Sequence, residues 1–170
     1  MDKTTYEKYK SLKIDKGLLC LEEREEIYPY FCYPDNAKAI GFEGNIMYCF
    51  IDGYEDMVFA CNPESCASKY VYPLAYNFDD FISLILYCAN ANVLEQIIWM
   101  NEKQFNEHML NEISIITKDH KNVLLKLEKE LNLKVITNPY AYVRNIQKDF
   151  NGSKIQFKDE YYEIVGIDIE

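Results

Sequence analysis

Cysteine is the residue type in this chain whose spacing comes nearest to a chemical motif. Cys61 and Cys66 are separated by four residues, but no second cysteine pair or histidine cluster follows at the spacing of a zinc site. A structural zinc would need Cys49 or Cys88 to join them through the fold. Because most of the six cysteines lie inside apolar runs, we interpret them as buried, reduced thiols. We therefore predict no metal and no disulfide framework.

Nucleophilic catalysis has little support in the sequence. The two histidines, His108 and His120, lie on predicted amphipathic helices beside polar residues. No feature brings either of them to a thiol of lowered pKa, as a Cys/His pair requires. The alternative from the enzyme class is a small hydrolase or transferase that uses Cys61 or Cys66 with a carboxylate. The phosphate-binding patterns GxGxxG and GxxxxGK[ST] are absent, so we predict a protein without cofactor or enzymatic activity.

Acidic residues dominate the charge of the chain. The formal net charge is −10 and the pI is about 4.7, which disfavours direct contact with nucleic acid or anionic membranes and favours a basic protein partner. The acid is grouped along the chain. The groups are Glu22, Glu23, Glu25 and Glu26; Asp52, Glu55 and Asp56; and Asp159, Glu160, Glu163, Asp168 and Glu170. One interpretation is solvated surface that keeps the protein soluble, and the other is a binding surface.

Two aromatic residues sharpen the second interpretation. Tyr54 is expected at the exposed tip of the loop that carries Asp52, Glu55 and Asp56, where an aromatic ring with an acidic rim resembles a hot spot for a cationic partner. These carboxylates also leave acid–base work open. Trp99, the only tryptophan, fits either a second exposed aromatic contact or the core.

Strand-like runs precede a helical half. AKAIGF, NIMYCFI and DMVFAC, between residues 37 and 61, have the length and composition of three strands joined by a hairpin at residues 44–45 and a loop at 52–55. They predict an antiparallel meander. The middle run is apolar at every position, so both of its faces should be covered, one by a helix at 77–91 and the other by the N-terminal segment or the late helices. The segment 62–73 is expected to connect the third strand to that helix.

The helices are predicted from their caps and periodicity. Asn77 and the Asn101/Gln104 pair mark two starts, and apolar residues recur every three or four positions in the helical segments. The expected helices cover residues 4–12, 77–91, 92–100, 101–116, 118–131 and 139–150. Residues 28–36 are expected to form a loop across the core, and 154–157 a short edge strand. The chain of 170 residues is expected to be one α+β domain, an antiparallel meander packed against a central helix, with residues 37–100 as its core and 101–170 as a helical C-terminal extension.

A family resemblance adds to this interpretation. Ile51-Asp52-Gly53-Tyr54 with Val58-Phe59, followed by Pro73-Leu74-Ala75 and Phe78-Asp79-Asp80-Phe81, resembles the SUKH superfamily over residues 37–100. That superfamily includes bacterial immunity proteins and a fungal regulator of cell-wall synthesis. The resemblance implies an α+β domain without enzymatic activity, whose sheet face and loops bind another protein. In bacteria that partner is often a toxin domain, frequently a nuclease.

The two lines of argument combine into one hypothesis. We expect a protein-binding module of the immunity type that neutralises a basic toxin domain through its acidic loops. The predicted binding residues are Asp52, Tyr54, Glu55, Asp56, Glu22, Glu23, Glu25 and Glu26. A regulatory scaffold in a cytoplasmic complex is the alternative. The N-terminus lacks the hydrophobic stretch of a signal peptide, and the longest apolar run, 81–89, is too short to span a bilayer, so we expect a cytoplasmic protein.

Overall fold

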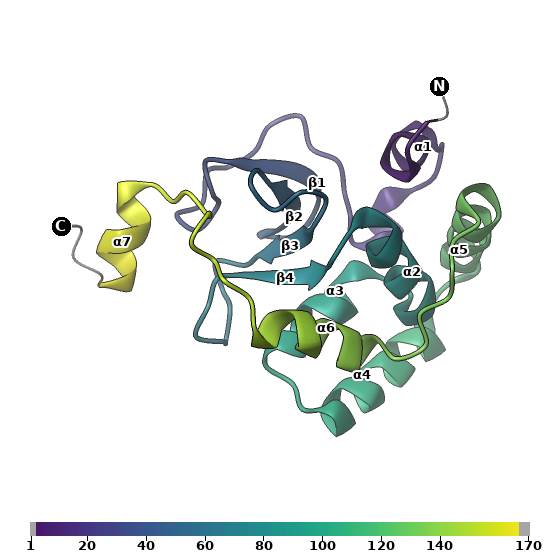
Figure 1. The fold of residues 1–170 in the computed structure, drawn as a ribbon. Helices are drawn as coiled ribbons and strands as arrows, with labels where there is room; N and C mark the ends of the chain where they lie inside the picture. The colour runs from purple at the N-terminus through teal and green to yellow at the C-terminus, as the bar shows by residue number, and fades with distance from the viewer. Residues whose placement is uncertain (1–2, 167–170) are drawn as a thin grey trace.

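A four-stranded antiparallel sheet and a set of helices form the α+β fold that the sequence predicts. The computed structural model describes residues 3–166. The strands are β1 Ala37–Glu43, β2 Ile46–Ile51, β3 Val58–Cys61 and β4 Val71–Ala75. The α-helices are α1 Thr5–Ser11, α2 Phe78–Cys88, α3 Ala91–Glu95, α4 Glu102–Ile115, α5 Lys118–Leu131, α6 Pro139–Lys148 and α7 Asp159–Val165, with 3-10 turns η1 Lys16–Leu19 and η2 Gln96–Ile98. In Figure 1, α6 runs beside β4, whereas α7 lies on the left, away from the other helices.

The sheet is a meander in the order β1-β2-β3-β4. The first three strands confirm the prediction, whereas β4 lies in the segment that we expected to be a plain connection followed by a helix. Pro73 explains the error, since proline in a run of this kind argues against a strand. In the structure β4 is an edge strand, and the Pro73 carbonyl accepts a hydrogen bond from Gln147 Nε2 of α6 at 3.1 Å.

Helices cover one face of the sheet. Tyr48 of β2, Ala60 of β3 and Leu74 of β4 belong to the cluster that also contains the apolar residues of α2 and α3. This confirms that the helix after residue 77 packs on the sheet. Residues such as Phe81 in α2 are fully buried, and burial of a side chain of this size contributes about 1.5–3 kcal/mol. The cluster therefore accounts for much of the stability of the fold.

Irregular chain covers the other face. Met47, Cys49 and Phe59 form the second buried cluster, and the residues packed against it come largely from 28–33 and 150–161. The expected loop of residues 28–36 across the core is confirmed, and the expectation that the N-terminal segment or the late helices cover this face is confirmed in part, since α7 contributes Tyr161 while residues 150–157 are irregular. Residues 154–157 are also not the predicted edge strand. The backbone N–H of Asp35 donates to the Gln156 carbonyl at 2.8 Å, which ties the two covering segments together.

Helix starts follow the local sequence closely. Asn77 accepts a hydrogen bond from the Asp80 N–H at 2.8 Å, and Asn101 with Gln104 forms the expected capping box. A side chain that satisfies the free N–H groups of the first turn contributes about 1 kcal/mol. Pro139 stands in the first turn of α6, as predicted. The caps thus confirm where these helices begin.

The helices were also compared with the requirements of a membrane span. Within residues 3–166, none of them is by itself long and apolar enough to cross a bilayer. The consecutive segments Phe78–Cys88 and Ala91–Ile98 meet the length and composition criteria only as a pair, with a bend of 105° between them.

Candidate functional site

An open groove of about 760 Å³ gathers carboxylates from two parts of the chain. We call it the acidic groove. Its charged lining consists of Glu55, Asp56, Asp79, Asp80, Lys38 and Lys134. Four carboxylates against two lysines leave an excess of two negative charges. Aromatic side chains of Tyr6, Phe50 and Phe78 form apolar parts of the same wall.

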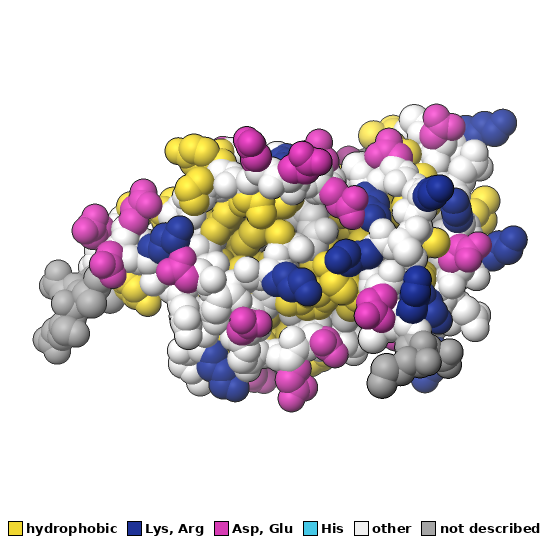
Figure 2. Space-filling model, turned by 90° about the horizontal axis from the view of Figure 1, so that it is seen from above, with side chains coloured by type: hydrophobic (Ala, Val, Ile, Leu, Met, Phe, Trp, Pro, Cys, Tyr) yellow, Lys and Arg dark blue, Asp and Glu magenta, His cyan; other side chains and the backbone are white. Residues whose placement is uncertain are grey.

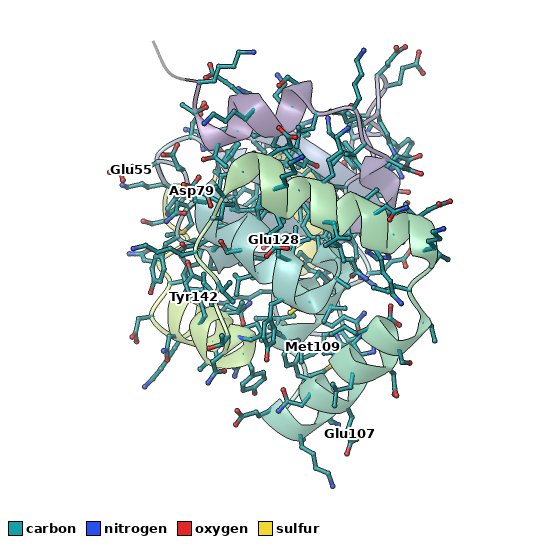
Figure 3. The ribbon with its side chains drawn as sticks, turned by 90° about the vertical axis from the view of Figure 1, so that its right-hand side faces the viewer. Glu55, Asp79, Glu107, Met109, Glu128 and Tyr142 are labelled. Carbon is teal, nitrogen blue, oxygen red and sulfur yellow. The ribbon has the colours of Figure 1, made fainter. Side chains whose placement is uncertain are left out.

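Two elements position these carboxylates. Glu55 and Asp56 lie on the loop between β2 and β3, and Glu55 adopts a left-handed backbone conformation with φ of 54°. Asp79 and Asp80 lie in the first turn of α2, where the helix dipole favours negative charge. Figure 3 shows Glu55 and Asp79 at the same edge of the molecule, above Tyr142. The groove is therefore assembled by the fold and not by one acidic loop.

Tyr142 fixes one side of the groove. Its hydroxyl donates to Asp80 Oδ2 at 2.6 Å and accepts from the Tyr76 N–H at 3.0 Å. Asp80 is therefore held in place, whereas no hydrogen bond is found for the side chains of Glu55, Asp56 and Asp79 within residues 3–166. Three carboxylates remain available to a ligand.

The predicted binding residues separate into two places. Glu22 pairs with Phe42 near the end of β1, whereas Asp52 donates its N–H to the Asn36 carbonyl beside the start of β1. Strands rise by about 3.3 Å per residue, so the two acidic groups lie at opposite ends of the strand. Figure 2, drawn from above, likewise shows Asp and Glu side chains at separate places around an exposed hydrophobic area. Of the predicted residues, only Glu55 and Asp56 line the acidic groove.

Two glutamates of the run from Glu22 to Glu26 form ion pairs within the chain. Glu23 accepts from the buried Lys16 ammonium at 2.5 Å. Glu22 pairs with Arg24 at 2.8 Å. Glu25 and Glu26 are exposed. Two of the four charges are thus neutralised within the chain, which weakens the run as a binding surface.

Tyr54 is not the exposed contact that we predicted. Its ring packs against Phe59 and Phe150, with centroids 5.3 Å from each. Its hydroxyl donates to the Asn151 carbonyl and accepts from the Lys154 N–H, both at 2.9 Å. The side chain is partly buried and fully used in joining the loop to the C-terminal segment, because a tyrosine can satisfy its hydroxyl while its ring is covered.

The thiols divide sharply by exposure. Cys66 is exposed, whereas Cys32, Cys49, Cys61 and Cys88 are buried. Burial raises the pKa of Cys61 well above its ordinary value. Cys61 is also fully covered, so a substrate cannot reach its sulfur in this fold, which argues against Cys61 as a nucleophile. All six cysteines are free in the structure, with the sulfur atoms of Cys49 and Cys61 3.6 Å apart.

Cys66 lies at a second pocket, of about 560 Å³, which we call the basic pocket. Its polar and aromatic lining includes Lys69, Arg144, Lys148, Gln147 and Trp99. Trp99 is 47% exposed, so it is not a core residue, and its role as an aromatic contact stays a prediction. No carboxylate and no histidine lines the pocket, so the Cys66–carboxylate pair of the enzyme hypothesis is not assembled there. His120 Nε2 instead lies 2.8 Å from the Ala89 carbonyl.

A buried carboxylate was missed entirely. Glu95 of α3 is 3% exposed and accepts hydrogen bonds from the Tyr72 hydroxyl and from Asn62 Nδ2, the latter at 2.9 Å. Burial raises the pKa of Glu95, partly offset by these two hydrogen bonds. The signal in the sequence was a single Glu inside the apolar run NVLEQIIW, where a charged residue on the inner face needs a partner.

No cluster of three or more metal-ligating side chains occurs within residues 3–166. Comparisons of the chain with protein-family models, with curated proteins and with solved structures find no match in any of the three. The resemblance to the SUKH superfamily therefore stays a prediction.

Proposed function

We propose that this protein is a non-enzymatic binding module that holds a basic segment of another protein in its acidic groove. The observation that carries the proposal is the convergence of Glu55 and Asp56 with Asp79 and Asp80 on one open groove. An acidic surface of this kind accelerates encounter with a basic partner and selects against acidic ones. The net charge of −10 acts in the same direction.

The groove chemistry fits lysine and arginine side chains. Carboxylates on two sides can pair with a cation, and the aromatic wall can cover its aliphatic stem. The chain supplies an internal example, since the Lys38 ammonium lies 5.7 Å from the centre of the Tyr6 ring. This distance is within the range of a cation–π contact. A partner cation could contact the partly exposed ring of Phe50 in the same way.

The partner class follows from the charge and the resemblance together. A nuclease toxin domain carries a basic surface for nucleic acid, and an acidic protein can occupy that surface by presenting similar charge. We therefore propose an immunity-type role for the chain, in the cytoplasm. A regulatory scaffold would use the same groove for a different basic protein. The identity of the partner distinguishes the two.

The test is a pull-down with the tagged protein from lysate of its source cells, and in parallel from a strain expressing a toxin, at low and high salt. The variant Glu55→Gln/Asp56→Asn removes two groove charges whose side chains make no hydrogen bond among the described residues. The control Glu107→Gln/Glu130→Gln removes two charges elsewhere, and Figure 3 shows Glu107 at the far end of the molecule from Glu55.

Capture of a basic toxin domain by the wild type and the control, lost at high salt and reduced in the groove variant, would support the immunity role. Capture of a cytoplasmic complex with the same dependence would support the scaffold. Equal capture by the groove variant would show that the partner binds elsewhere. Loss of two paired charges at an interface typically weakens binding by about tenfold or more.

A further inference from the structure

The basic pocket has a charge opposite to that of the whole molecule. Lys69 reaches it from the loop between β3 and β4, and Arg144 and Lys148 reach it from α6, where a spacing of four places them on one face of the helix. All three are exposed, and none makes an ion pair within residues 3–166. In a chain with 28 acidic and 18 basic residues, three cations without a carboxylate in the same lining mark a site for an anion.

A buried polar group borders the same pocket. Gln147 is 8% exposed, its Nε2 donates to the Pro73 carbonyl, and its Oε1 has no hydrogen-bond partner among the described residues. The amide cannot be turned to relieve this, since Oε1 would then face the Pro73 carbonyl oxygen. A buried acceptor without a donor costs about 1–3 kcal/mol. Because Oε1 is covered by protein atoms, a ligand in the pocket reaches it only if the Gln147 side chain shifts.

Trp99 supplies a flat apolar surface beside these polar groups. It follows η2 at the pocket wall and leaves 47% of its surface exposed. An exposed indole is suited to stack on a planar ring. The volume of about 560 Å³ lies within the usual range for small-molecule sites.

We propose that the basic pocket binds a phosphorylated small molecule with a planar nitrogenous ring, chemically a nucleoside monophosphate. Arg144, Lys148 and Lys69 hold the phosphate, because guanidinium and ammonium groups form strong charge-assisted hydrogen bonds with phosphate oxygens. Trp99 covers the ring. This site is separate from the acidic groove and shares no lining residue with it.

The only tryptophan of the chain makes the binding directly observable. Titration with adenosine monophosphate should quench Trp99 fluorescence, when it is excited where tyrosine does not absorb. Adenosine and inorganic phosphate, tested separately, should each bind at least about tenfold more weakly, because each lacks part of the contact set. The same ligand should slow alkylation of Cys66, the exposed thiol in the pocket wall.

The variant Arg144→Gln/Lys148→Gln should lose at least about tenfold in affinity for adenosine monophosphate, since it removes two charge-assisted contacts. The control Lys121→Gln/Lys129→Gln removes two exposed lysines of α5, outside the pocket, and should bind as the wild type does. Circular dichroism checks that both variants fold. Because Trp99→Phe lacks the fluorescent reporter, its affinity for adenosine monophosphate is measured by calorimetry.

Three results would overturn the proposal. The first is the absence of calorimetric binding of adenosine monophosphate at millimolar concentration. The second is equal affinity in the wild type and in the Arg144→Gln/Lys148→Gln variant. The third is inorganic phosphate binding as tightly as the nucleotide, which would remove the role of Trp99. None of these results bears on capture of a basic partner by the acidic groove.

Discussion

Removal of the buried Glu95 side chain should destabilise the fold by roughly 3–5 kcal/mol. Glu95→Ala leaves the Tyr72 hydroxyl, in a residue that is 1% exposed, and the half-buried Asn62 amide without their acceptor. Each buried, unsatisfied donor costs about 1–3 kcal/mol, and each lost methylene adds about 0.8 kcal/mol. Glu95→Gln keeps an acceptor oxygen at the same place. It should therefore differ from the wild type by about 1 kcal/mol or less at low pH, where both side chains are neutral.

The raised pKa of Glu95 sets the direction in which the free energy of unfolding changes with pH. Burial raises the pKa of Glu95 in the folded chain, so the folded state holds that proton more tightly than the unfolded state. The resulting stability is fully present below the unfolded pKa of about 4.3 and is lost as the pH rises through the raised folded value. The wild type should lose stability relative to Glu95→Gln across that interval.

Urea unfolding followed by circular dichroism, at a series of pH values, measures both effects in the wild type and the two variants. At low pH Glu95→Gln should remain close to the wild type, and Glu95→Ala should fall well below both. A Gln variant as unstable as the Ala variant would show that the hydrogen bonds from Tyr72 and Asn62 are not the reason for the loss. Parallel pH curves for the wild type and the Gln variant would refute the raised pKa.

Three further predictions concern other parts of the chain. Tyr54→Phe removes two hydrogen bonds between the β2–β3 loop and the C-terminal segment and should lower the free energy of unfolding in urea by about 1–2 kcal/mol. The control Tyr28→Phe, at a residue 71% exposed, should leave it unchanged. Equal losses in the two variants would contradict the anchoring role of Tyr54. Gly41→Ala places a Cβ 2.7 Å from the backbone of Leu21 and should destabilise the fold by about 1–3 kcal/mol. In the control Gly152→Ala the new Cβ meets only ordinary side-chain contacts. Unfolding midpoints that shift equally in the two variants would argue against the close approach at Gly41. Alkylation of the folded protein followed by mass spectrometry should modify Cys66 far faster than the other five cysteines. Fast modification of Cys32, Cys49, Cys61 or Cys88 would contradict the burial of these side chains.

The sequence predicted most helices because the relevant signals are local. A cap such as Asn77 satisfies an N–H three residues away, and the Asn101/Gln104 box lies within one turn. The apolar runs likewise predicted the first three strands. Pro73 concealed β4, because a tolerated proline can be recognised only when the strand is known to be an edge. Residues 154–157 resembled a strand, but their apolar side chains serve to cover the sheet.

The residues of the candidate sites were harder to predict from the sequence than the helices and strands were. Glu55 and Asp56 were expected to bind a partner, but Asp79 and Asp80 were not among the predicted binding residues. The fold brings all four to one groove by placing α2 beside the β2–β3 loop. Tyr54 failed as an exposed contact because its partner Phe150 lies almost a hundred positions later in the chain.

The sequence by itself determined the α+β class, the caps of the helices, the loop of residues 28–36 across the core and the strong negative charge, since each depends on composition or on neighbours within a few residues. Tertiary structure alone decided that Glu95 is buried, that residues 150–157 cover the second face of the sheet, and that Lys69 lies with Arg144 and Lys148 in a basic pocket. These features join residues that are distant along the chain, and long-range packing has no counterpart in the periodicity of a single segment.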